Sequence, residues 1–394
     1  MLLGEAKVSL KSLIIDYYIE LKIIAIIKEE NMKGKVAIFA GPMNDMEFRE
    51  YPLPEVGADD ILVKIHRANI CGSDLHIWRG HGPGMPRKRP TVPGHEMVGE
   101  IFRLGKNVRS DCLGQPLEEG DRIAYSYFSA CGVCPACLNG SPACPNRYRN
   151  WMQDANESPH FRGAYGEYYY LHKGQTVCKI PPELSDEIVA PVNCALCESI
   201  YGLDQIGIRL GDTLVVQGAG GLGLYATAVA KDMGAAQVIV FDKLPDRLEL
   251  AKAFGADWVV NVDEVDEKGR REIVFDRTRG QGADVVGEFV GAPQAVEEGI
   301  RLLRQAGRYF WVGNITPGTG SNLDPGTVVR GSQTIRGIAV YEPWVLPRAI
   351  DFLVRRRNVY PFEKIISNTF PFEEINKAFH FANEGKAIRV SLKM

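Results

Sequence analysis

A glycine-rich turn near the middle of the chain constrains the fold more than any other feature. Residues 218–223 read Gly-Ala-Gly-Gly-Leu-Gly, directly after the apolar run 213–217 and at the start of a helical pattern over 222–233. In such a G-x-G-x-x-G turn, Gly218 permits the tight turn, Gly220 lets the backbone approach a pyrophosphate, and Gly223 lets the helix pack closely on the strand. The free N–H groups of the helix N-terminus then bind the phosphates. The pattern predicts a dinucleotide site.

An acidic residue at the end of the next apolar run strengthens this interpretation. Asp242 closes the run 237–242, near the spacing of about 20 residues expected for the acid that binds a ribose 2′-hydroxyl. A carboxylate there repels a 2′-phosphate, so we expect NAD in preference to NADP. Lys243 and Arg247 nearby weaken this preference without reversing it. The alternative interpretation is a plain turn of an α/β fold, with no cofactor.

The character of the sequence changes along the chain and predicts two domains. From residue 32 to about 198 the pattern is mostly β, whereas from 199 to 339 short apolar runs alternate with helical segments. Such alternation is typical of a doubly wound parallel sheet covered by helices on both faces. Residues 340–394, with an amphipathic helix over 346–356, are expected to return to the first domain. Residues 1–31 form an extension of unknown role.

Composition excludes several other classes of protein. Lys and Arg total 46 against 49 for Asp and Glu, a net charge of −3, which disfavours a nucleic-acid or anionic-membrane binder. The sequence contains no uncharged apolar run of about 18 residues, so we expect no membrane span. The first residues lack the pattern of a secretory signal. We expect a cytoplasmic protein.

Cysteines gather in one short, glycine- and proline-containing segment. Four of the nine occur within residues 131–144: Cys131, Cys134, Cys137 and Cys144. Four thiolates complete a closed tetrahedron around zinc, which predicts a structural metal site. The alternatives are an iron–sulfur cluster, two disulfides, or a zinc ribbon that binds nucleic acid. The last two are disfavoured by the absence of a secretory signal and by the balanced charge.

A second group of metal-binding residue types is spread along the chain. Cys71 is followed by Gly94-His95, and a third ligand must come from elsewhere; Cys194, in Pro-Val-Asn-Cys-Ala, is available. A catalytic zinc takes three protein ligands and keeps one position open. Glu198, close to Cys194, is a rival third ligand because zinc also accepts carboxylate.

At these residues the sequence resembles the zinc-dependent alcohol dehydrogenases of the medium-chain dehydrogenase/reductase family, from about residue 32 to the C-terminus. The resemblance implies an α/β protein, with a mostly β, GroES-like catalytic domain over 32–198 and a Rossmann domain over 199–339. It implies a catalytic zinc on Cys71, His95 and Cys194, the ligand set known for alcohol dehydrogenase. It also implies a structural zinc in the 131–144 segment, hence two zinc ions per chain.

The resemblance assigns further roles. Ser73 and His76 match the proton relay, Asp74 matches a residue that supports the zinc ligands, and Glu96 matches a carboxylate near the metal. Arg389 matches an arginine that reaches the cofactor phosphates. The resemblance also implies a homodimer or homotetramer.

We therefore expect zinc-assisted hydride transfer between an alcohol or polyol and NAD. The alternatives are a zinc-containing reductase of another activated carbonyl or alkene, and a non-catalytic nucleotide sensor. The substrate itself is left open. Tyr148 and Trp151 either line a substrate site or belong to the core, and Cys112 and Cys178 are expected to be packed thiols.

Overall fold

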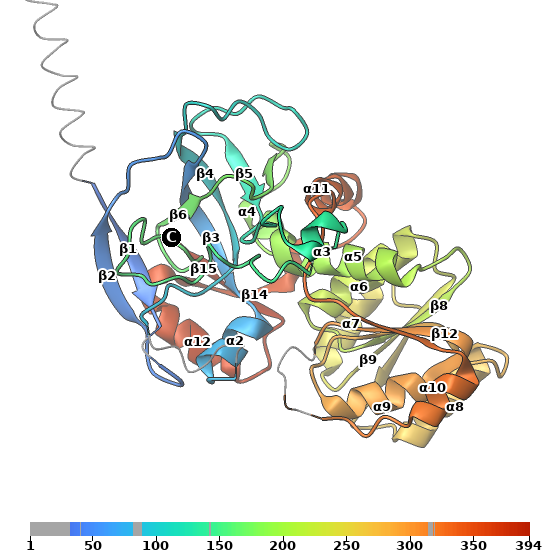
Figure 1. Cartoon of the computed structure of the whole chain (residues 1–394). Helices are drawn as coiled ribbons and strands as arrows, with labels where there is room; N and C mark the ends of the chain where they lie inside the picture. Colours follow the sequence, from blue (N-terminus) through green and yellow to red (C-terminus); the bar gives the residue numbers. More distant parts are fainter. Residues whose placement is uncertain (1–31, 40, 82–88, 142, 314–317, 319) are drawn as a thin grey trace, which may run out of the picture.

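The computed structural model describes residues 32–39, 41–81, 89–141, 143–313, 318 and 320–394. The extension expected over residues 1–31 lies outside them. The described chain forms two lobes, a β-rich lobe and an α/β lobe, which meet along helices α5 (Cys197–Ile206), α6 (Gly221–Asp232) and α11 (Val345–Arg356) (Figure 1).

The α/β lobe is built on a parallel sheet in the order β10-β9-β8-β11-β12-β13. Its strands are β8 (Thr213–Gln217), β9 (Gln237–Asp242), β10 (Trp258–Asn261), β11 (Ala283–Glu288), β12 (Leu303–Trp311) and β13 (Thr334–Gly337). Strand order reverses between β8 and β11, the place where doubly wound sheets bind dinucleotides. All five residues of β8 are buried, as a sheet covered on both faces requires.

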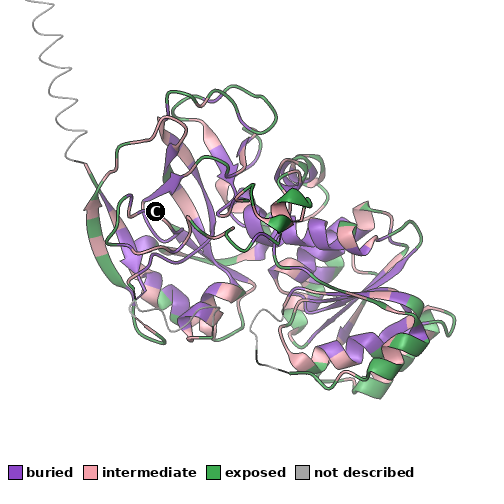
Figure 2. Ribbon diagram, in the orientation of Figure 1, coloured by how far each residue is buried: buried purple, intermediate pink, exposed green. Residues whose placement is uncertain are grey.

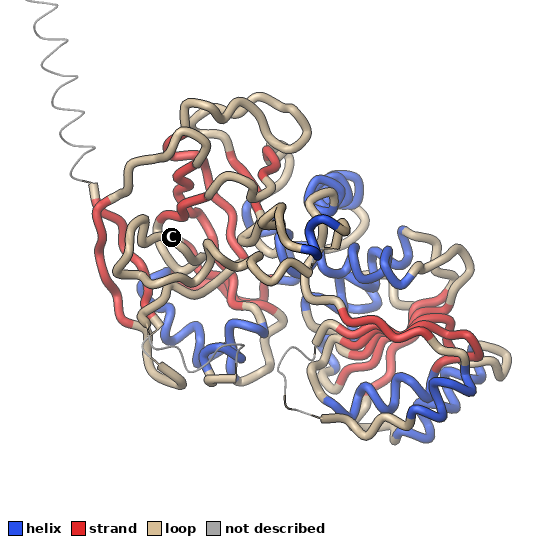
Figure 3. Tube along the Cα trace, viewed as in Figure 1, coloured by secondary structure: helices blue, strands red, loops and turns tan. Residues whose placement is uncertain are grey.

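Helices cover both faces of this sheet (Figure 3). One face packs against α6 and α7 (Pro245–Ala253), and the other against α8 (Glu267–Arg277) and α9 (Pro293–Leu302). A short helix, α10 (Pro325–Gly331), precedes β13. Glycines with positive φ follow α6 and α7, Gly234 at +98° and Gly255 at +96°, which ends each helix where the sequence predicts. The expected doubly wound fold is confirmed.

The β-rich lobe contains a sheet in the order β14-β15-β3-β4-β5-β7, with β6 paired to β3. These strands are β3 (Ile61–Ile70), β4 (Glu96–Leu104), β5 (Arg122–Tyr125), β6 (Tyr168–Leu171), β7 (Val177–Lys179), β14 (Ile366–Pro371) and β15 (Arg389–Lys393). A separate hairpin joins β1 (Lys33–Ile38) to β2 (Glu47–Pro52). The shorter helical elements here are α2 (Gly72–Trp78), α3 (Pro135–Leu138), α4 (Asp186–Val189) and α12 (Ile375–Asn383).

The C-terminal segment pairs with the first lobe. Strand β15 runs antiparallel to β3, with Val390 opposite Ile70, and β14 lies beside it. The chain therefore leaves the β-rich lobe, forms the α/β sheet and returns. This return brings Arg389 next to the end of β3, directly before Cys71.

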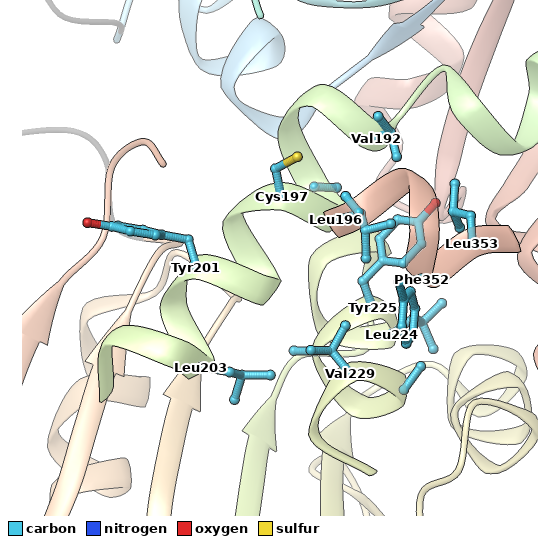
Figure 4. Close-up of a cluster of buried hydrophobic side chains, with 14 of the residues drawn as sticks. Val192, Leu196, Cys197, Tyr201, Leu203, Leu224, Tyr225, Val229, Phe352 and Leu353 are labelled. Atoms are coloured by element: carbon cyan, nitrogen blue, oxygen red, sulfur yellow. The ribbon is translucent and has the colours of Figure 1, made fainter. Parts of the chain in front are cut away.

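A single buried cluster joins the two lobes (Figure 4). Side chains of α5, α6 and α11 meet there with those of η1 (Val192–Leu196), a short π-helical turn; they include Leu196, Tyr225 and Phe352. Figure 2 shows the buried residues continuing through this junction. The hydroxyl of Tyr341 donates to the carbonyl of Asn193 at 2.7 Å. The η1 turn, which carries Cys194, is thus fixed between the lobes.

Among the described residues, no helix has both the length and the apolar character that a bilayer crossing requires.

Candidate metal centres and dinucleotide site

Three distant segments bring metal-binding side chains together in the interior. The ligand atoms of Cys71, His95, Glu96 and Cys194 all lie within 4.8 Å of one another, and all four residues are buried. The Cys71 and Cys194 sulfurs are 4.0 Å apart. Two thiols and an imidazole converging in a buried place are donors that suit zinc.

One carboxylate positions two of these groups. Asp74 Oδ2 accepts the backbone N–H of Cys71 at 2.9 Å, while Asp74 Oδ1 lies 3.1 Å from Nδ1 of His95. An Nδ1–H donated to Asp74 leaves Nε2 of His95 for a metal, the usual arrangement behind a ligating histidine. The Tyr165 hydroxyl also donates to Asp74 Oδ2, at 2.9 Å. The sequence gives no signal for Tyr165, which lies 91 positions away from Asp74.

The backbone of His95 is held as well. The amide of Asn193 donates to the carbonyls of His95 and Tyr125, at 3.0 and 2.9 Å. Since Asn193 precedes Cys194 in η1, this amide fixes two of the candidate ligand segments relative to each other.

The residues expected to relay a proton lie on one face of α2. The Ser73 hydroxyl is 3.4 Å from Nε2 of His95, and His76 follows three positions later on the helix. Burial lowers the pKa of His76, and the nearby charges of Arg79 and His81 lower it further. His76 is therefore neutral at pH 7 and able to accept a proton.

Glu96 and Arg389 form a buried ion pair beside the cluster. Burial raises the pKa of Glu96 to about 7, although the Arg389 guanidinium acts in the opposite direction. Arg389 also borders the glycine-rich turn, because a Cβ added to Gly221 would lie 2.7 Å from Arg389 Nη2. The arginine expected at the cofactor phosphates thus reaches the turn but directs its guanidinium at Glu96.

The rival ligand Glu198 lies on α5, 9% exposed. Burial raises its pKa to about 8, with the neighbouring Cys71 sulfur adding to the effect. Within the described part of the chain, the set of mutually close ligand atoms includes Cys194 and Glu96 but not Glu198.

Aromatic rings pack around the buried imidazole of His95. The ring centroids of Tyr127 and Trp151 lie 4.8 and 5.8 Å from that of His95, and Tyr148 packs against both at 5.9 and 5.4 Å. The indole N–H of Trp151 donates to the Gly94 carbonyl at 2.7 Å. This N–H is the only hydrogen-bonding group of the Trp151 side chain, so the rest of the ring is an apolar surface.

The second cysteine group forms a compact local cluster. The four sulfurs lie together beside the short helix α3, which contains Cys137 and follows Cys134, with separations of 3.9 Å (Cys131–Cys137), 3.5 Å (Cys134–Cys137) and 3.8 Å (Cys134–Cys144). Sulfurs at ~2.3 Å from a zinc ion stand about 3.8 Å apart at the corners of a tetrahedron. All four thiols are free, which does not match two disulfides. The geometry fits a closed four-sulfur metal site.

The glycine-rich turn has the conformation that the sequence predicts. Gly218 has φ +102°, and a Cβ on Gly223 would lie 1.8 Å from the Gly218 carbonyl oxygen, so both positions require glycine. A Cβ on Gly220 would meet nothing within 4 Å, which leaves that side of the turn open to a ligand.

A cavity of about 380 Å³ adjoins this turn. Its lining includes Gly218, Gly220, Asp242, Lys243 and Arg247. Asp242 Oδ2 accepts the Ala219 N–H at 2.7 Å, which ties the end of β9 to the turn. An open glycine backbone beside a helix N-terminus, with a carboxylate across the cavity, fits a dinucleotide.

Comparison with known proteins agrees with this geometry. Residues 57–182 match the alcohol dehydrogenase GroES-like domain, and residues 221–355 match the zinc-binding dehydrogenase domain. The 5-exo-hydroxycamphor dehydrogenase of Pseudomonas putida is 30% identical over 349 residues, covering 88% of this chain and 95% of that protein. The chain belongs to the zinc-binding alcohol dehydrogenases.

Other members of this family give the same result. The L-threonine 3-dehydrogenase of Bacillus subtilis is 31% identical over 87% of this chain and 93% of its own length. The crystal structure of an alcohol dehydrogenase from Thermotoga maritima superimposes with a TM-score of 0.86, at 30% identity, over 92% of this chain and all of that one. The protein is therefore a zinc-binding, NAD(P)-dependent oxidoreductase of CH–OH groups, and the predicted GroES-like and Rossmann domains are confirmed.

Proposed function

We propose that the protein oxidises an alcohol to the corresponding aldehyde or ketone with NAD, at a zinc ion held by Cys71, His95 and Cys194. A second zinc is proposed for the lobe formed by residues 131–144. The observation that carries the proposal is the convergence of two thiols and an imidazole, all buried, next to the Ser73 hydroxyl. Three ligands leave zinc a fourth position for the substrate oxygen.

When bound, the zinc supplies Lewis-acid polarisation of the substrate oxygen, and NAD supplies the hydride acceptor. The protein holds these groups and moves the proton. Asp74 fixes the tautomer of His95. Ser73 accepts the hydroxyl proton of the substrate, and the half-buried His76, neutral because burial lowers its pKa, is the next proton acceptor along α2.

The charges at the centre support oxidation. With zinc bound, thiolates at Cys71 and Cys194 would balance its two positive charges, while the Arg389 guanidinium compensates Glu96. Added negative charge on a substrate oxygen is therefore tolerated at this buried place.

NAD is proposed as the preferred cofactor because of Asp242. Its carboxylate lines the cavity at the glycine-rich turn and is held by the N–H groups of Ala219 and Leu244, at 2.7 and 2.9 Å. A carboxylate fixed in this way hydrogen-bonds a ribose 2′-hydroxyl and repels a 2′-phosphate. Arg247 donates to the carbonyls of Gly385 and Ala387, and its Nη1 lies 3.9 Å from Asp242 Oδ2, so it weakens the effect of Asp242 without reversing it.

The aromatic rings near His95 support an alcohol with an apolar body in preference to a polyol. Tyr127, Tyr148 and Trp151 give this side of the centre mostly ring surface. Apart from the hydroxyls of Tyr127 and Tyr148, this surface is ring carbon, and polyol hydroxyls that face ring carbon lose their hydrogen-bond partners, which is costly. The Pseudomonas putida relative acts on hydroxycamphor and the Bacillus subtilis relative on L-threonine, so the preference rests on the rings and not on the relatives.

We further propose a homodimer or homotetramer in the cytoplasm. The outer strand β13 ends the parallel sheet, and among the described strands nothing pairs with its free edge. The free thiols of the nine cysteines suit a reducing compartment. Light scattering on the purified protein would measure the assembly.

The test combines metal analysis with turnover followed by NADH absorbance, using cyclic alcohols, linear alcohols and polyols with NAD or NADP. The proposal predicts two zinc ions per chain and the fastest turnover with an apolar cyclic alcohol and NAD. Reduction of an activated alkene without oxidation of any alcohol would favour the reductase alternative. Tight NAD binding with no turnover of any alcohol or carbonyl would favour a nucleotide sensor.

A further inference from the structure

Two cysteines outside both metal centres lie in unusually close contact. The sulfurs of Cys112 and Cys178 are 2.9 Å apart, closer than the sulfur pairs of the metal centres, which are 3.5–4.0 Å apart. A disulfide bond is ~2.0 Å long, so the two sulfurs need to approach by only about 1 Å. Cys178 is buried, as expected of a packed thiol, whereas Cys112 is exposed, which the sequence did not predict.

The backbone on both sides holds this pair in place. The N–H of Cys112 donates to the carbonyl of Val177 at 2.9 Å, and the N–H of Lys179 donates to Asp111 Oδ2 at 3.0 Å. The other Asp111 oxygen accepts the N–H groups of Leu113 and Gln115, which fixes the turn that carries Cys112. Neighbouring hydrogen-bonded segments lie ~5 Å apart. That spacing falls within the Cα separation of roughly 4.4–6.8 Å that disulfides adopt.

The two thiols differ in exposure, as the two members of an oxidisable pair must. Cys112 is exposed to solvent, whereas Cys178 is buried behind it in β7. The hydrogen bond from Cys178 lowers the pKa of Cys112, and the same contact, together with burial, raises the pKa of Cys178. A thiolate that solvent reaches is the group that reacts first with an oxidant.

We propose that Cys112 and Cys178 are a redox modification site, which a peroxide converts to an intramolecular disulfide. The Cys112 thiolate attacks hydrogen peroxide, the O–O bond breaks, and Cys112 becomes a sulfenic acid. The Cys178 sulfur then attacks the Cys112 sulfur, forming the S–S bond and releasing the second oxygen as water. In total two thiols lose two electrons and two protons, and one peroxide becomes two waters. A dithiol reductant reverses the reaction by exchange.

The disulfide would close a loop of the chain that contains the four-cysteine segment, residues 131–144. Cys112 and Cys178 are 66 positions apart, and the residues between them include the whole cysteine lobe and the aromatic residues near His95. Closing a loop of this length restricts the unfolded chain. The oxidised protein should therefore melt about 2–5 °C higher than the reduced one. Turnover should change less than twofold, since neither cysteine contacts the proposed metal ligands.

The test uses the full-length, zinc-loaded protein. After peroxide or oxidised glutathione treatment, free thiols are blocked with an alkylating reagent and the peptides are mapped by mass spectrometry. The proposal predicts one disulfide joining Cys112 to Cys178, unchanged zinc content, a higher melting temperature, and complete reversal by a dithiol. Cys112→Ser should abolish the rise in melting temperature, whereas Cys197→Ser, which alters the other cysteine outside the centres, should keep it.

Three results would overturn the proposal. In the first, the cysteines of residues 131–144 are oxidised before Cys112 and zinc is released. In the second, Cys112 is oxidised to sulfinic acid and forms no disulfide with Cys178. The third is a wild-type protein in which both thiols stay reduced under these oxidants. The wild-type peptide map decides among these outcomes even if a variant fails to fold.

Discussion

The two candidate metal centres are built from similar side chains but in opposite ways. The first centre, which we call the cysteine lobe, takes four sulfurs from one segment of 14 positions, residues 131–144. It lies partly at the surface. The interior centre takes Cys71, His95 and Cys194 from three segments, all buried, with acidic and hydroxyl groups beside them. A local, four-sulfur set closes around its ion, whereas a non-local set of three leaves room for a substrate.

The surroundings of the two centres differ as much as their ligands. In the lobe, the exposed side chains of Val133 and Leu138 border the sulfurs and add no titratable group. In the interior, burial raises the pKa of both Glu96 and Glu198, to about 7 and about 8. Carboxyl groups with such displaced pKa values are typical of reacting sites. The difference supports our proposal that one centre holds the fold together and the other carries the chemistry.

The largest expected effect comes from Cys194. Cys194→Ala should remove the interior zinc, keep the lobe zinc and lower kcat at least ~10³-fold, or about 4 kcal/mol of transition-state stabilisation. Metal analysis and NADH absorbance measure both effects. Glu198→Ala is the matched control, expected to keep two zinc ions. If Glu198→Ala loses the interior zinc and Cys194→Ala keeps it, the ligand assignment is wrong.

The next prediction concerns the zinc site proposed for residues 131–144. Cys134→Ala should leave three sulfurs, release the lobe zinc and make residues 131–147 sensitive to protease, because a structural zinc site contributes its binding energy to folding. The interior zinc should remain, and turnover should fall less than in Cys194→Ala. Val133→Ser, in the same lobe but with an exposed side chain, should behave as wild type. Equal loss of both ions in Cys134→Ala would show that the centres are not independent.

A smaller effect is expected at the cofactor side of the interior centre. Asp242→Asn removes the negative charge but keeps an oxygen that can accept the Ala219 N–H. The preference for NAD over NADP, measured as a ratio of kcat/KM values, should fall about tenfold or more, since a carboxylate–phosphate repulsion is removed. Asp246→Asn, an exposed charge in the first turn of α7, is the control. An unchanged ratio in Asp242→Asn would contradict the assigned role.

The smallest effect concerns pH. Burial lowers the pKa of His76 below its ordinary value of 6.5, so the neutral, proton-accepting form is present above that lowered pKa and is lost as pH falls through it. Alcohol oxidation should decline over the same range. His76→Gln should lose this inflection and lower kcat about tenfold at pH 7, within the range of general-base effects. His81→Gln, exposed beyond α2, removes a charge that lowers the pKa of His76, so it should keep the inflection and move it to higher pH.

Local features account for what could be predicted from the sequence. The spacing of Cys131, Cys134 and Cys137 and the turn at Gly218 are each contained in one short segment, and the structure has the predicted geometry at both. Contacts between distant segments could not be predicted in this way. Residue type alone made Cys194 an available ligand, but its pairing with Cys71 and His95 came from resemblance to a family, because nothing in its own segment specifies a partner at Cys71.

The same reason explains the contacts that sequence reasoning missed. Glu96 and Arg389 are separated by 293 positions and meet only because β15 returns to β3. Tyr165 reaches Asp74 across the β-rich lobe, and Cys112 contacts Cys178 because a turn is hydrogen-bonded to β7. Such pairs depend on strand register and on burial, which a pattern along one segment does not contain.

Replacement of zinc by cobalt tests the central claim most directly, because thiolate-bound Co²⁺ absorbs visible light and its spectrum reports changes in coordination. The doubly substituted protein should change its spectrum when alcohol is added with a non-reacting NAD analogue. The Cys134→Ala variant should retain this response, and Cys194→Ala should lack it. A response that disappears in Cys134→Ala and persists in Cys194→Ala would place the open centre in the lobe and contradict the account.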